Sequence, residues 1–359
     1  MYKKLISMVV ALIAVMVLFT GCLGSDKTEE TTKAEAAVET KTEAAVETEV
    51  KDAKVIKISM GVNDKHPSYL AAVKFGEIIA EKTNGRYDVQ VFANAQLGDD
   101  IKATEAVKMG NLEMAIPSAS PLVGLDPDLN VLDLPFLFPN TKAADAVLDG
   151  PVGQKIAQKL EDNGLHLLAY YENGFRNITN SAHEITTPAD LKGLKIRTME
   201  NKIHLAAFKA MGANPTPMPF SELFTAMQQE TIDGQENPIP TIFLSKFNEV
   251  QDYCTLTEHV YGPHLLLINK DLFESMTPED QKIFTDAATE SKLYQRETNR
   301  AMAADYVEKL RAEGMIVTEL TAEQKQAFKD ACAPVYKEFE ELIGKDLIDE
   351  VQAVIEKNK

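Results

Sequence analysis

Three residues in the stretch 191–240 have side chains suited to holding a small carboxylate. Arg197 ends an apolar run, Asn237 stands before Pro238, and Phe220 lies at a turn between them. A guanidinium presents a rigid fork that gives a carboxylate two parallel hydrogen bonds. An asparagine amide both donates and accepts, and the following proline restricts its backbone to extended angles. Spacing alone leaves three alternatives open: an arginine paired with a nearby acid, a turn asparagine and a core phenylalanine.

Strands and helices alternate along the part of the chain that carries these residues. This rhythm predicts an α/β fold with a mostly parallel sheet, whose ligands bind beyond the carboxyl ends of the strands, where Arg197 stands. The expected strands are 55–62, 87–93, 114–116, 166–173, 194–199 and 264–270. The expected helices are 68–84, one opened by Gly98-Asp99, 201–211 and 222–230, the last with Ser221 as a plausible N-cap.

A much longer helix is expected after the last of these strands. Thr277 is a capping residue, Pro278 suits the first helical position, and acidic residues follow. No helix breaker then occurs before Gly314. A coiled coil is the general explanation for such a length.

The stretch LKGLKIRTMENKIHLAAFKAMGANPTPMPFSELFTAMQQETIDGQENPIP resembles the solute-binding proteins of tripartite ATP-independent periplasmic (TRAP) transporters, the DctP family. The similarity covers roughly residues 55–340. It implies a two-lobed, type II-like periplasmic-binding-protein fold with one long helix spanning both lobes. It also implies that Arg197 forms the salt bridge with the ligand carboxylate, that Asn237 binds beside it, and that Phe220 covers the apolar face of the ligand.

The resemblance implies further contacts. Arg176, in NGFRNITN, supports the ligand charge directly or through water, with a structural ion pair as the alternative. His66, Gln96 and Ser118 fall where the family draws contacts from its first lobe, although His66 is equally placed to cap a helix. Ser118 replaces the acid of the sialic-acid-binding branch, which disfavours sialic acid. Glu200 departs from branches with small or amide residues, and would either accept from sugar hydroxyls or lock Arg197.

Little in the sequence supports catalysis, a cofactor or a metal site. It contains no HExxH, phosphate-binding glycine loop, GxSxG or paired-cysteine motif, and its six histidines are scattered. Cys254 and Cys332 match no metal or redox spacing and are expected to be buried free thiols. Tyr261 and His264, near the predicted crossover between lobes, are weaker candidates for ligand contact.

The N-terminus has the pattern of a targeting segment. Lys3 and Lys4 precede a short uncharged apolar run at 5–20, and Gly21-Cys22 closes it. This predicts a signal peptide at 1–21 and lipidation of Cys22. An ordinary secretory signal is the alternative, because Phe19 stands where lipoprotein signals usually carry leucine.

Residues 22–53 are predicted to be the lipidated cysteine and a disordered acidic tether, with a small coiled coil as the alternative. The folded part is then divided into lobe 1, at 54–174 with a return segment at about 263–300, and lobe 2, at 175–262 with C-terminal helices at about 301–359. The formal net charge of −18 argues against nucleic acid and against broad contact with anionic lipid, so the membrane contact expected is the lipid anchor alone.

The function that unites these features is that of an extracytoplasmic solute-binding lipoprotein, lipid-anchored to the cell membrane, which is not an enzyme. It would capture a small organic carboxylate, either a sugar acid or a dicarboxylate, and deliver it to the membrane subunits of a TRAP permease. Glu200 and His66 favour a hydroxylated sugar acid. A ligand-sensing module for a signalling receptor is the main alternative, and an extracytoplasmic enzyme with the same fold is a further one.

Overall fold

The computed structural model describes residues 53–359. The predicted signal peptide at 1–21, the lipidation site Cys22 and the predicted tether up to residue 52 lie outside the described residues. Within residues 53–359, no helix combines the length and the apolar character that a membrane span requires.

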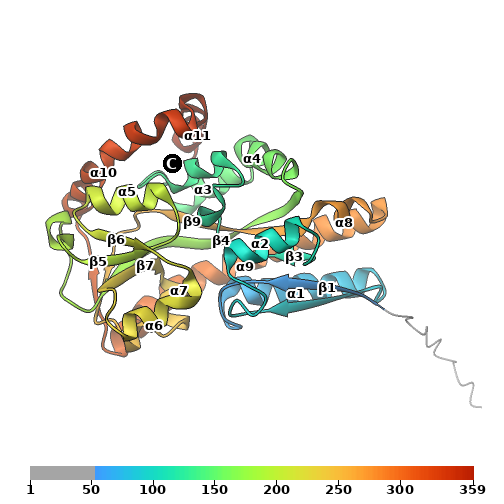
Figure 1. The fold of residues 1–359 in the computed structure, drawn as a ribbon, viewed down its shortest axis with the longest axis horizontal. Coiled ribbons are helices and arrows are strands. Elements are labelled where there is room, and N and C mark those ends of the chain that lie inside the picture. Colours follow the sequence, from blue (N-terminus) through green and yellow to red (C-terminus); the bar gives the residue numbers. More distant parts are fainter. Residues whose placement is uncertain (1–52) are drawn as a thin grey trace, which may run out of the picture. The chain divides into compact units, whose positions relative to one another are not determined.

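A mixed ten-stranded sheet forms the centre of the described part, and one long strand, β4 (Leu165–Asn180), belongs to both of its halves (Figure 1). Up to Phe175, β4 pairs with β9, whereas from Arg176 onward it pairs with β7 and β8. The first half contains β1 (Lys54–Ser59), β2 (Tyr87–Phe92), β3 (Met114–Ala115) and β9 (Tyr261–Asn269). The second half contains β5 (Lys195–Thr198), β6 (Asn214–Pro217), β7 (Gly234–Pro238), β8 (Tyr253–Leu256) and β10 (Ile316–Glu319).

Helices cover both halves of the sheet. The first half carries α1 (Pro67–Lys82), α2 (Asp100–Lys108) and α8 (Lys270–Glu274), and α3 (Thr141–Leu148) and α4 (Pro151–Glu161) precede β4. The second half carries α5 (Lys202–Ala210), α6 (Leu223–Gln228) and α7 (Ile239–Leu244). The remaining helices are α9 (Pro278–Ala312), α10 (Ala322–Ile343) and α11 (Lys345–Asn358).

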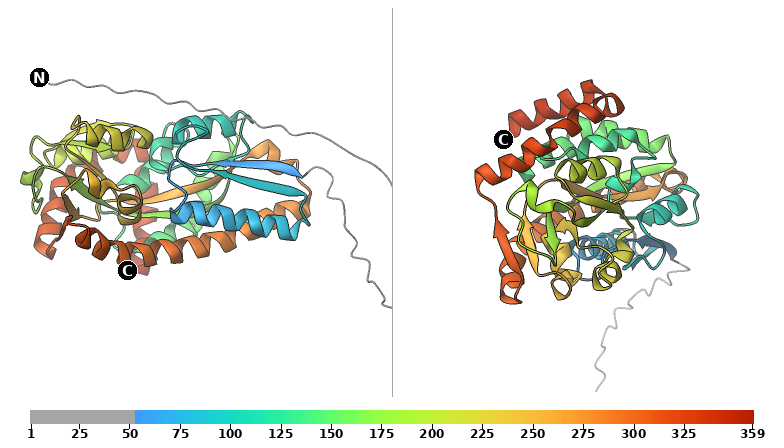
Figure 2. Two further views of the ribbon diagram at one scale, coloured as in Figure 1. Left: turned by 90° about the horizontal axis from the view of Figure 1, so that it is seen from below. Right: turned by 60° about the vertical axis from the view of Figure 1, so that its left-hand side comes forward.

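Helix α9 spans both lobes, as the resemblance implies. It packs against α1 in the first half and against α7 and β10 in the second (Figure 2). The side chain of Thr277 caps its first turn by accepting from the backbone N–H of Asp280, and Pro278 occupies the first helical position. The sequence pattern therefore predicted both ends of this helix correctly, and the two-lobed α/β fold with a spanning helix is confirmed.

Gly174 marks the point where β4 passes from one half of the sheet to the other. Its φ is 115°, and a Cβ atom built there would lie 3.3 Å from Asn299 Nδ2 and 3.5 Å from Pro238 Cβ. The pairing of β4 with β9 also shifts register between Glu172 and Gly174. Glycine is required at this position because other residues adopt such a φ only with strain. The irregularity lets a single strand serve two lobes.

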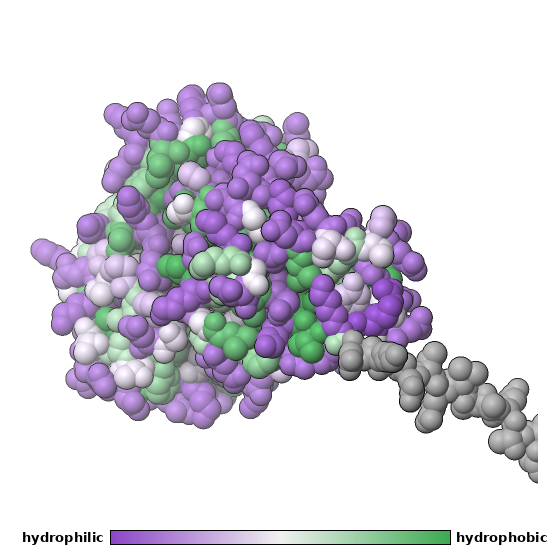
Figure 3. Space-filling view, turned by 45° about the vertical axis from the view of Figure 1, so that its right-hand side comes forward, coloured by the Kyte–Doolittle hydropathy of each residue, from purple (hydrophilic) through white to green (hydrophobic). Residues whose placement is uncertain are grey.

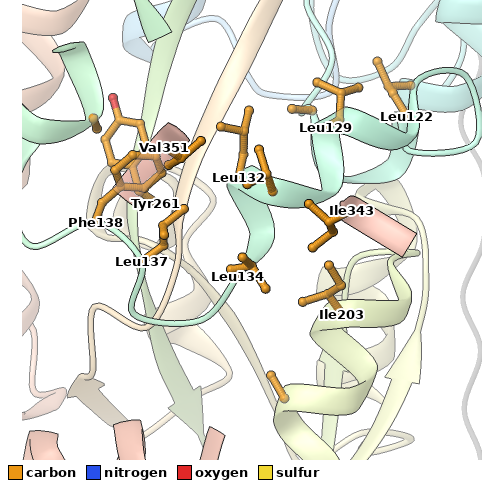
Figure 4. Close-up of a cluster of buried hydrophobic side chains, with 14 of the residues drawn as sticks. Leu122, Leu129, Leu132, Leu134, Leu137, Phe138, Ile203, Tyr261, Ile343 and Val351 are labelled. Atoms are coloured by element: carbon orange, nitrogen blue, oxygen red, sulfur yellow. The ribbon is translucent and has the colours of Figure 1, made fainter. Parts of the chain in front are cut away.

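Buried side chains form three hydrophobic clusters. One lies between the first half of the sheet and helices α1 and α9, and another joins α6 and α7 to the C-terminal part of α9. In the third, leucines of the segment 122–137 meet Ile203 of α5, Ile343 of α10 and Val351 of α11 (Figure 4). Cys254 and Cys332 are buried free thiols, as expected. On the face that Figure 3 shows, hydrophilic residues predominate and hydrophobic residues form small separate groups.

The expectation of a mostly parallel sheet holds only in part, because five of the nine strand pairings in the described residues are parallel and four are antiparallel. Strand β9 returns antiparallel to both β3 and β4, and β4 is antiparallel to β7 and β8 as well. Strands β1, β2 and β3 are parallel in the first half of the sheet, and β5, β6 and β7 are parallel in the second, as the alternation of strands and helices predicts. The alternation does not predict the direction of β4 and β9, the strands that join the two halves. The predicted lobe boundaries stay a prediction. Of the two C-terminal helices, α10 packs on α5 of the second half, whereas α11 packs on α3, which precedes β4.

Candidate functional site

A cavity lies between the two halves of the fold, at the ends of several strands. Its free space, with the open mouth included, is about 590 Å³. It is lined by residues that follow β1, β3 and β5, by the starts of α2 and α7, and by the end of β7. Five predicted site residues line it, namely Ser118, Arg197, Glu200, Phe220 and Asn237.

Arg197 is buried in the second half of the sheet and lines the cavity. Strand β5 holds it beside Gln235 of β7, and its Nε and Nη2 donate to the carbonyl oxygen of Met218 at 2.8 and 2.5 Å. Its Nη1 has no hydrogen-bond partner among the described residues. Burial lowers the pKa of Arg197 to about 10, so the side chain stays charged at neutral pH. The cavity therefore contains a fixed cation with free donors.

Arg176 is also buried, but it is paired. Its Nε and Nη2 donate to the carboxylate of Glu236, the Nη2 distance being 2.9 Å, and Nη2 also donates to the Glu236 carbonyl oxygen at 2.5 Å. Arg176 does not line the cavity. Its contact with the site is indirect, through a 3.1 Å hydrogen bond from Nη2 to Oδ1 of Asn237. The alternative weighed from the sequence, a structural ion pair, describes this geometry.

A second cation shares the carboxylate of Glu236. His204 of α5 lies 2.9 Å from Asp133 Oδ1 and 3.9 Å from Glu236 Oε1. Burial would lower the pKa of His204, but the two carboxylates outweigh it and raise that pKa to about 9. Burial would likewise raise the pKa of Glu236, but the charge of Arg176, the nearby His204 and the hydrogen bond with His259 hold it well below its usual value. We call Arg176, Glu236, His204 and Asp133 the buried ion cluster.

Asn237 connects this cluster to the cavity. It ends β7, where Pro238 follows in extended geometry, and its side chain lines the cavity. Its Oδ1 accepts from Arg176, and its Nδ2 donates to Gln235 Oε1 at 2.5 Å. These bonds fix the orientation of the amide before any ligand arrives.

His66 links the two halves rather than lining the cavity. It is the N-cap of α1, where its Nδ1 accepts from the Ser68 N–H at 3.2 Å, and its Nε2 lies 3.2 Å from Thr241 Oγ1 in α7. Since Nδ1 accepts, Nε2 carries the proton and donates to Thr241, which in turn donates to Asn173 Oδ1 at 3.1 Å. Burial lowers the pKa of His66 to about 3, so the ring is neutral.

The remaining predicted residues differ in position. Ser118 lines the cavity and bridges to His264 of β9, which also lines it. Phe220 lines the cavity from the opposite half; a Cβ atom built on Gly61 would lie 4.0 Å from its ring. Gln96 is exposed and does not line the cavity. The structure therefore does not bring Gln96, His66 or Arg176 into the lining.

The lining residues that were not predicted as site residues include Asp100, Asn173 and Thr241. Asp100 begins α2, directly after the Gly98-Asp99 pair that signalled the start of this helix, so its proximity to the site was accessible from the sequence. Asn173 and Thr241 depend on the irregular crossing of β4 and on the start of α7 after Pro238, for which the sequence carried no comparable signal.

Residues 58–342 match the DctP family, described as bacterial extracellular solute-binding protein, family 7. The chain belongs to this family. One relative within the DctP family is the 2,3-diketo-L-gulonate-binding periplasmic protein of Escherichia coli, which is 39% identical over 280 residues. The aligned part is 78% of this chain and 84% of that protein.

Solved structures of TRAP solute-binding proteins share the fold. The sugar acid binding protein of Advenella mimigardefordensis, in complex with galactonate, is 40% identical with a TM-score of 0.84, over 86% of this chain and all of that one. The TRAP periplasmic solute-binding protein of Sulfurospirillum deleyianum, with bound succinate, is 35% identical with a TM-score of 0.81, over 84% of this chain and 100% of that one.

DctP-family proteins are solute receptors, and the cavity agrees with that role. In residues 53–359, no group of three or more His, Cys, Asp or Glu side chains is arranged to hold a metal ion. The charged group that the described cavity presents to an anion is the guanidinium of Arg197.

Proposed function

We propose that this protein captures a small organic carboxylate in the cavity between its lobes and delivers it to the membrane subunits of a TRAP permease. The observation that carries the proposal is the buried, charged guanidinium of Arg197, which lines the cavity with Nη1 free of any partner in residues 53–359. Glu236, Glu200 and Asp100 favour its charged form from a distance, but no carboxylate of the described chain is hydrogen-bonded to it. A buried guanidinium without such a direct partner is costly, which favours an anionic ligand.

The guanidinium retains a usable edge after its bonds to Met218. Nε and one hydrogen of Nη2 point to that carbonyl, which leaves Nη1 and the second hydrogen of Nη2 for a carboxylate. Asn237, held by Arg176 and Gln235, lines the same cavity and would present its amide to the ligand, and Phe220 would contact the apolar face of the ligand. Arg176 acts through Asn237.

Closure of the lobes would follow from contacts that the ligand makes with both halves. Ser118 belongs to the first half, and Arg197 and Asn237 belong to the second. The halves are also joined directly, by the His66–Thr241 hydrogen bond and by Asn63 Nδ2, which donates to the Leu244 carbonyl oxygen at 2.8 Å. A ligand shifts the equilibrium toward the closed form only to the extent that it binds that form better.

The proposal includes extracytoplasmic placement through a lipid anchor. The signal-peptide pattern at 1–21, the cysteine at position 22 and the acidic segment that follows support it. The description of the family as extracellular agrees with this location. Delivery to a permease is supported by the TRAP relatives.

A thermal-shift screen of organic acids tests the capture step. A ligand present at about 100 times its Kd adds about 2.7 kcal/mol to the free energy of unfolding, which raises the melting temperature measurably. We expect at least one carboxylate to stabilise the protein, and its neutral amide or alcohol analogue to have no effect. Stabilisation by uncharged analogues as strong as that by the acids would contradict the proposal.

A further inference from the structure

Acidic side chains outnumber basic ones in the lining of the cavity. Arg197 is the one Lys or Arg side chain among the described lining residues. His264 also lines the cavity, but burial holds its pKa well below the usual value, so it is neutral. Arg176, a further buried guanidinium, is bonded to Glu236 and lies outside the lining. A ligand with two carboxylates therefore finds one cation.

Two carboxyl groups line the same cavity near Arg197, and neither is hydrogen-bonded to a basic side chain of residues 53–359. Asp100, at the start of α2, accepts one hydrogen bond, from the Ser118 N–H to Oδ2 at 3.2 Å. Glu200 is half-buried and makes no hydrogen bond with residues 53–359. Asp99 differs from both, because Lys102 donates to it from the backbone at 2.9 Å and from Nζ at 2.7 Å.

Burial raises the pKa of both Asp100 and Glu200. For Asp100 the raised pKa is about 6, against the opposing charge of Arg197. A carboxyl group is left in such surroundings at a cost to stability unless a partner compensates. Together with the free Nη1 of Arg197, which is an independent feature, these groups indicate the kind of ligand that completes the site.

Building on the proposed function, we propose that the ligand is a polyhydroxylated monocarboxylate, such as an aldonate or a uronate, and that Asp100 and Glu200 select it over dicarboxylates. Carboxylates accept strong hydrogen bonds from hydroxyl groups, so each can bind the polyol chain of a sugar acid. The same groups repel a second carboxylate, which would also be desolvated without a counter-charge. Arg197 binds the single carboxylate of the ligand.

Affinities measured by isothermal titration calorimetry test this assignment on the full mature chain. The probes are D-galactonate and D-glucuronate on one side and succinate and L-malate on the other. We expect the wild-type protein to bind one or both sugar acids at least about 100-fold more tightly than either dicarboxylate, since juxtaposed like charges cost several kcal/mol.

Charge-neutral variants then assign the selection to residues. In Asp100→Asn and Glu200→Gln, we expect the affinity for the sugar acid to fall about 10-fold or more and the affinity for succinate to rise. The ratio of sugar-acid affinity to succinate affinity should therefore be smaller than in the wild type. The matched control Asp162→Asn removes an exposed carboxylate from the end of α4, outside the cavity lining, and should leave both affinities unchanged. Circular dichroism confirms that each variant is folded.

The possible results separate this inference from the proposed function. Succinate binding equal to or tighter than sugar-acid binding in the wild type overturns the selection but leaves carboxylate capture intact. Variants that weaken the binding of sugar acids and dicarboxylates by the same factor also overturn it. Asp100 and Glu200 would then affect the arrangement of the lobes rather than contact the ligand. Failure of all four acids to bind, with no acid stabilising the protein in the wider screen, overturns both proposals.

Discussion

Arg176 and Arg197 lie in the same half of the sheet, are both buried, and differ in what surrounds them. Arg176, on β4, belongs to the buried ion cluster, where Glu236 accepts from it and His204 lies nearby. Nη1 has no hydrogen-bond partner in residues 53–359 in either arginine, but Arg197, on β5, donates to a backbone carbonyl and to no carboxylate. The charge of Arg176 is therefore paired with a carboxylate of the protein, whereas Arg197 has no carboxylate bonded to it in residues 53–359.

The difference shows that burial alone does not identify a ligand-binding arginine. Removing two charges from water is costly, and a buried pair persists only when geometry and further hydrogen bonds offset that cost. Glu236 satisfies this condition for Arg176, with His204 and His259 as additional partners. No carboxylate among the described residues is hydrogen-bonded to Arg197, and in the proposed function the ligand supplies that group.

The largest effect should come from replacing Arg197. Arg197→Ala is expected to cost about 3–5 kcal/mol of binding free energy, because the ligand carboxylate would remain buried without a partner. This corresponds to roughly two to three and a half decades in Kd. Arg197→Lys should also bind poorly, since an ammonium cannot reproduce the guanidinium fork. Calorimetry with the best ligand of the thermal screen measures both.

The variant Lys195→Ala provides the control, because Lys195 is an exposed cation on the same strand. It should bind as the wild type does. The Arg197 variants should remain folded, since their side chain takes part in no ion pair of the described structure. Near-wild-type affinity of Arg197→Ala would show that the two arginines do not differ in the way proposed.

The corresponding change in the buried ion cluster should affect stability rather than binding chemistry. Glu236→Gln leaves Arg176 without its anion and is expected to lower the free energy of unfolding by about 3–5 kcal/mol. Chemical denaturation measures this loss. Glu230→Gln removes an exposed carboxylate on the loop before β7 and should have little effect.

A double replacement guards against a Glu236→Gln protein that does not fold. In Arg176→Met with Glu236→Met, apolar groups replace both members of the pair, which is often tolerated where removal of one member is not. We expect the double variant to be more stable than Glu236→Gln. If Glu236→Gln were as stable as the wild type, the compensation of Arg176 by Glu236 would not explain why this arginine stays out of the cavity.

The sequence predicted elements whose signals are local. Thr277 and Pro278 set the start of α9, and the apolar run before Arg197 placed that residue at the end of β5. Strand β6 was not predicted, because its sequence NPTP holds two prolines, and prolines are tolerated there only at the edge of the sheet. The antiparallel return of β9 likewise depends on long-range pairing, which no short motif encodes.

The same limit applies to the site. Spacing alone left the roles of Arg197, Asn237 and Phe220 open, and the resemblance to the DctP family predicted the site that all three line. The partner of Arg176 could not be found in this way, because Glu236 lies 60 residues further along the chain and reaches it through the pairing of β4 with β7. Whether an arginine is free or paired is a property of the folded sheet, and this decides its role.

A smaller effect is expected from the difference between Glu236, which is bonded to Arg176, and Asp100, which lines the cavity with Arg197. The pKa of Glu236 is lowered, whereas burial raises that of Asp100 to about 6, with the Ser118 N–H and the Arg197 charge opposing and the Asp99 charge adding. Because this folded-state pKa exceeds the unfolded value, the contribution of Asp100 to stability is fully present below pH 4 and is lost as the pH rises through about 6.

Asp100→Asn should therefore raise the melting temperature of the ligand-free protein at pH 8 by about 2 °C and change it little near pH 4. Melting curves across this pH range, with Asp162→Asn as the exposed control, measure the difference. An equal shift at both pH values would mean that the substitution acts through packing rather than through charge. A pH-dependent gain would show that the cavity keeps an anion at a cost to stability, whereas the buried ion cluster keeps one that the fold requires.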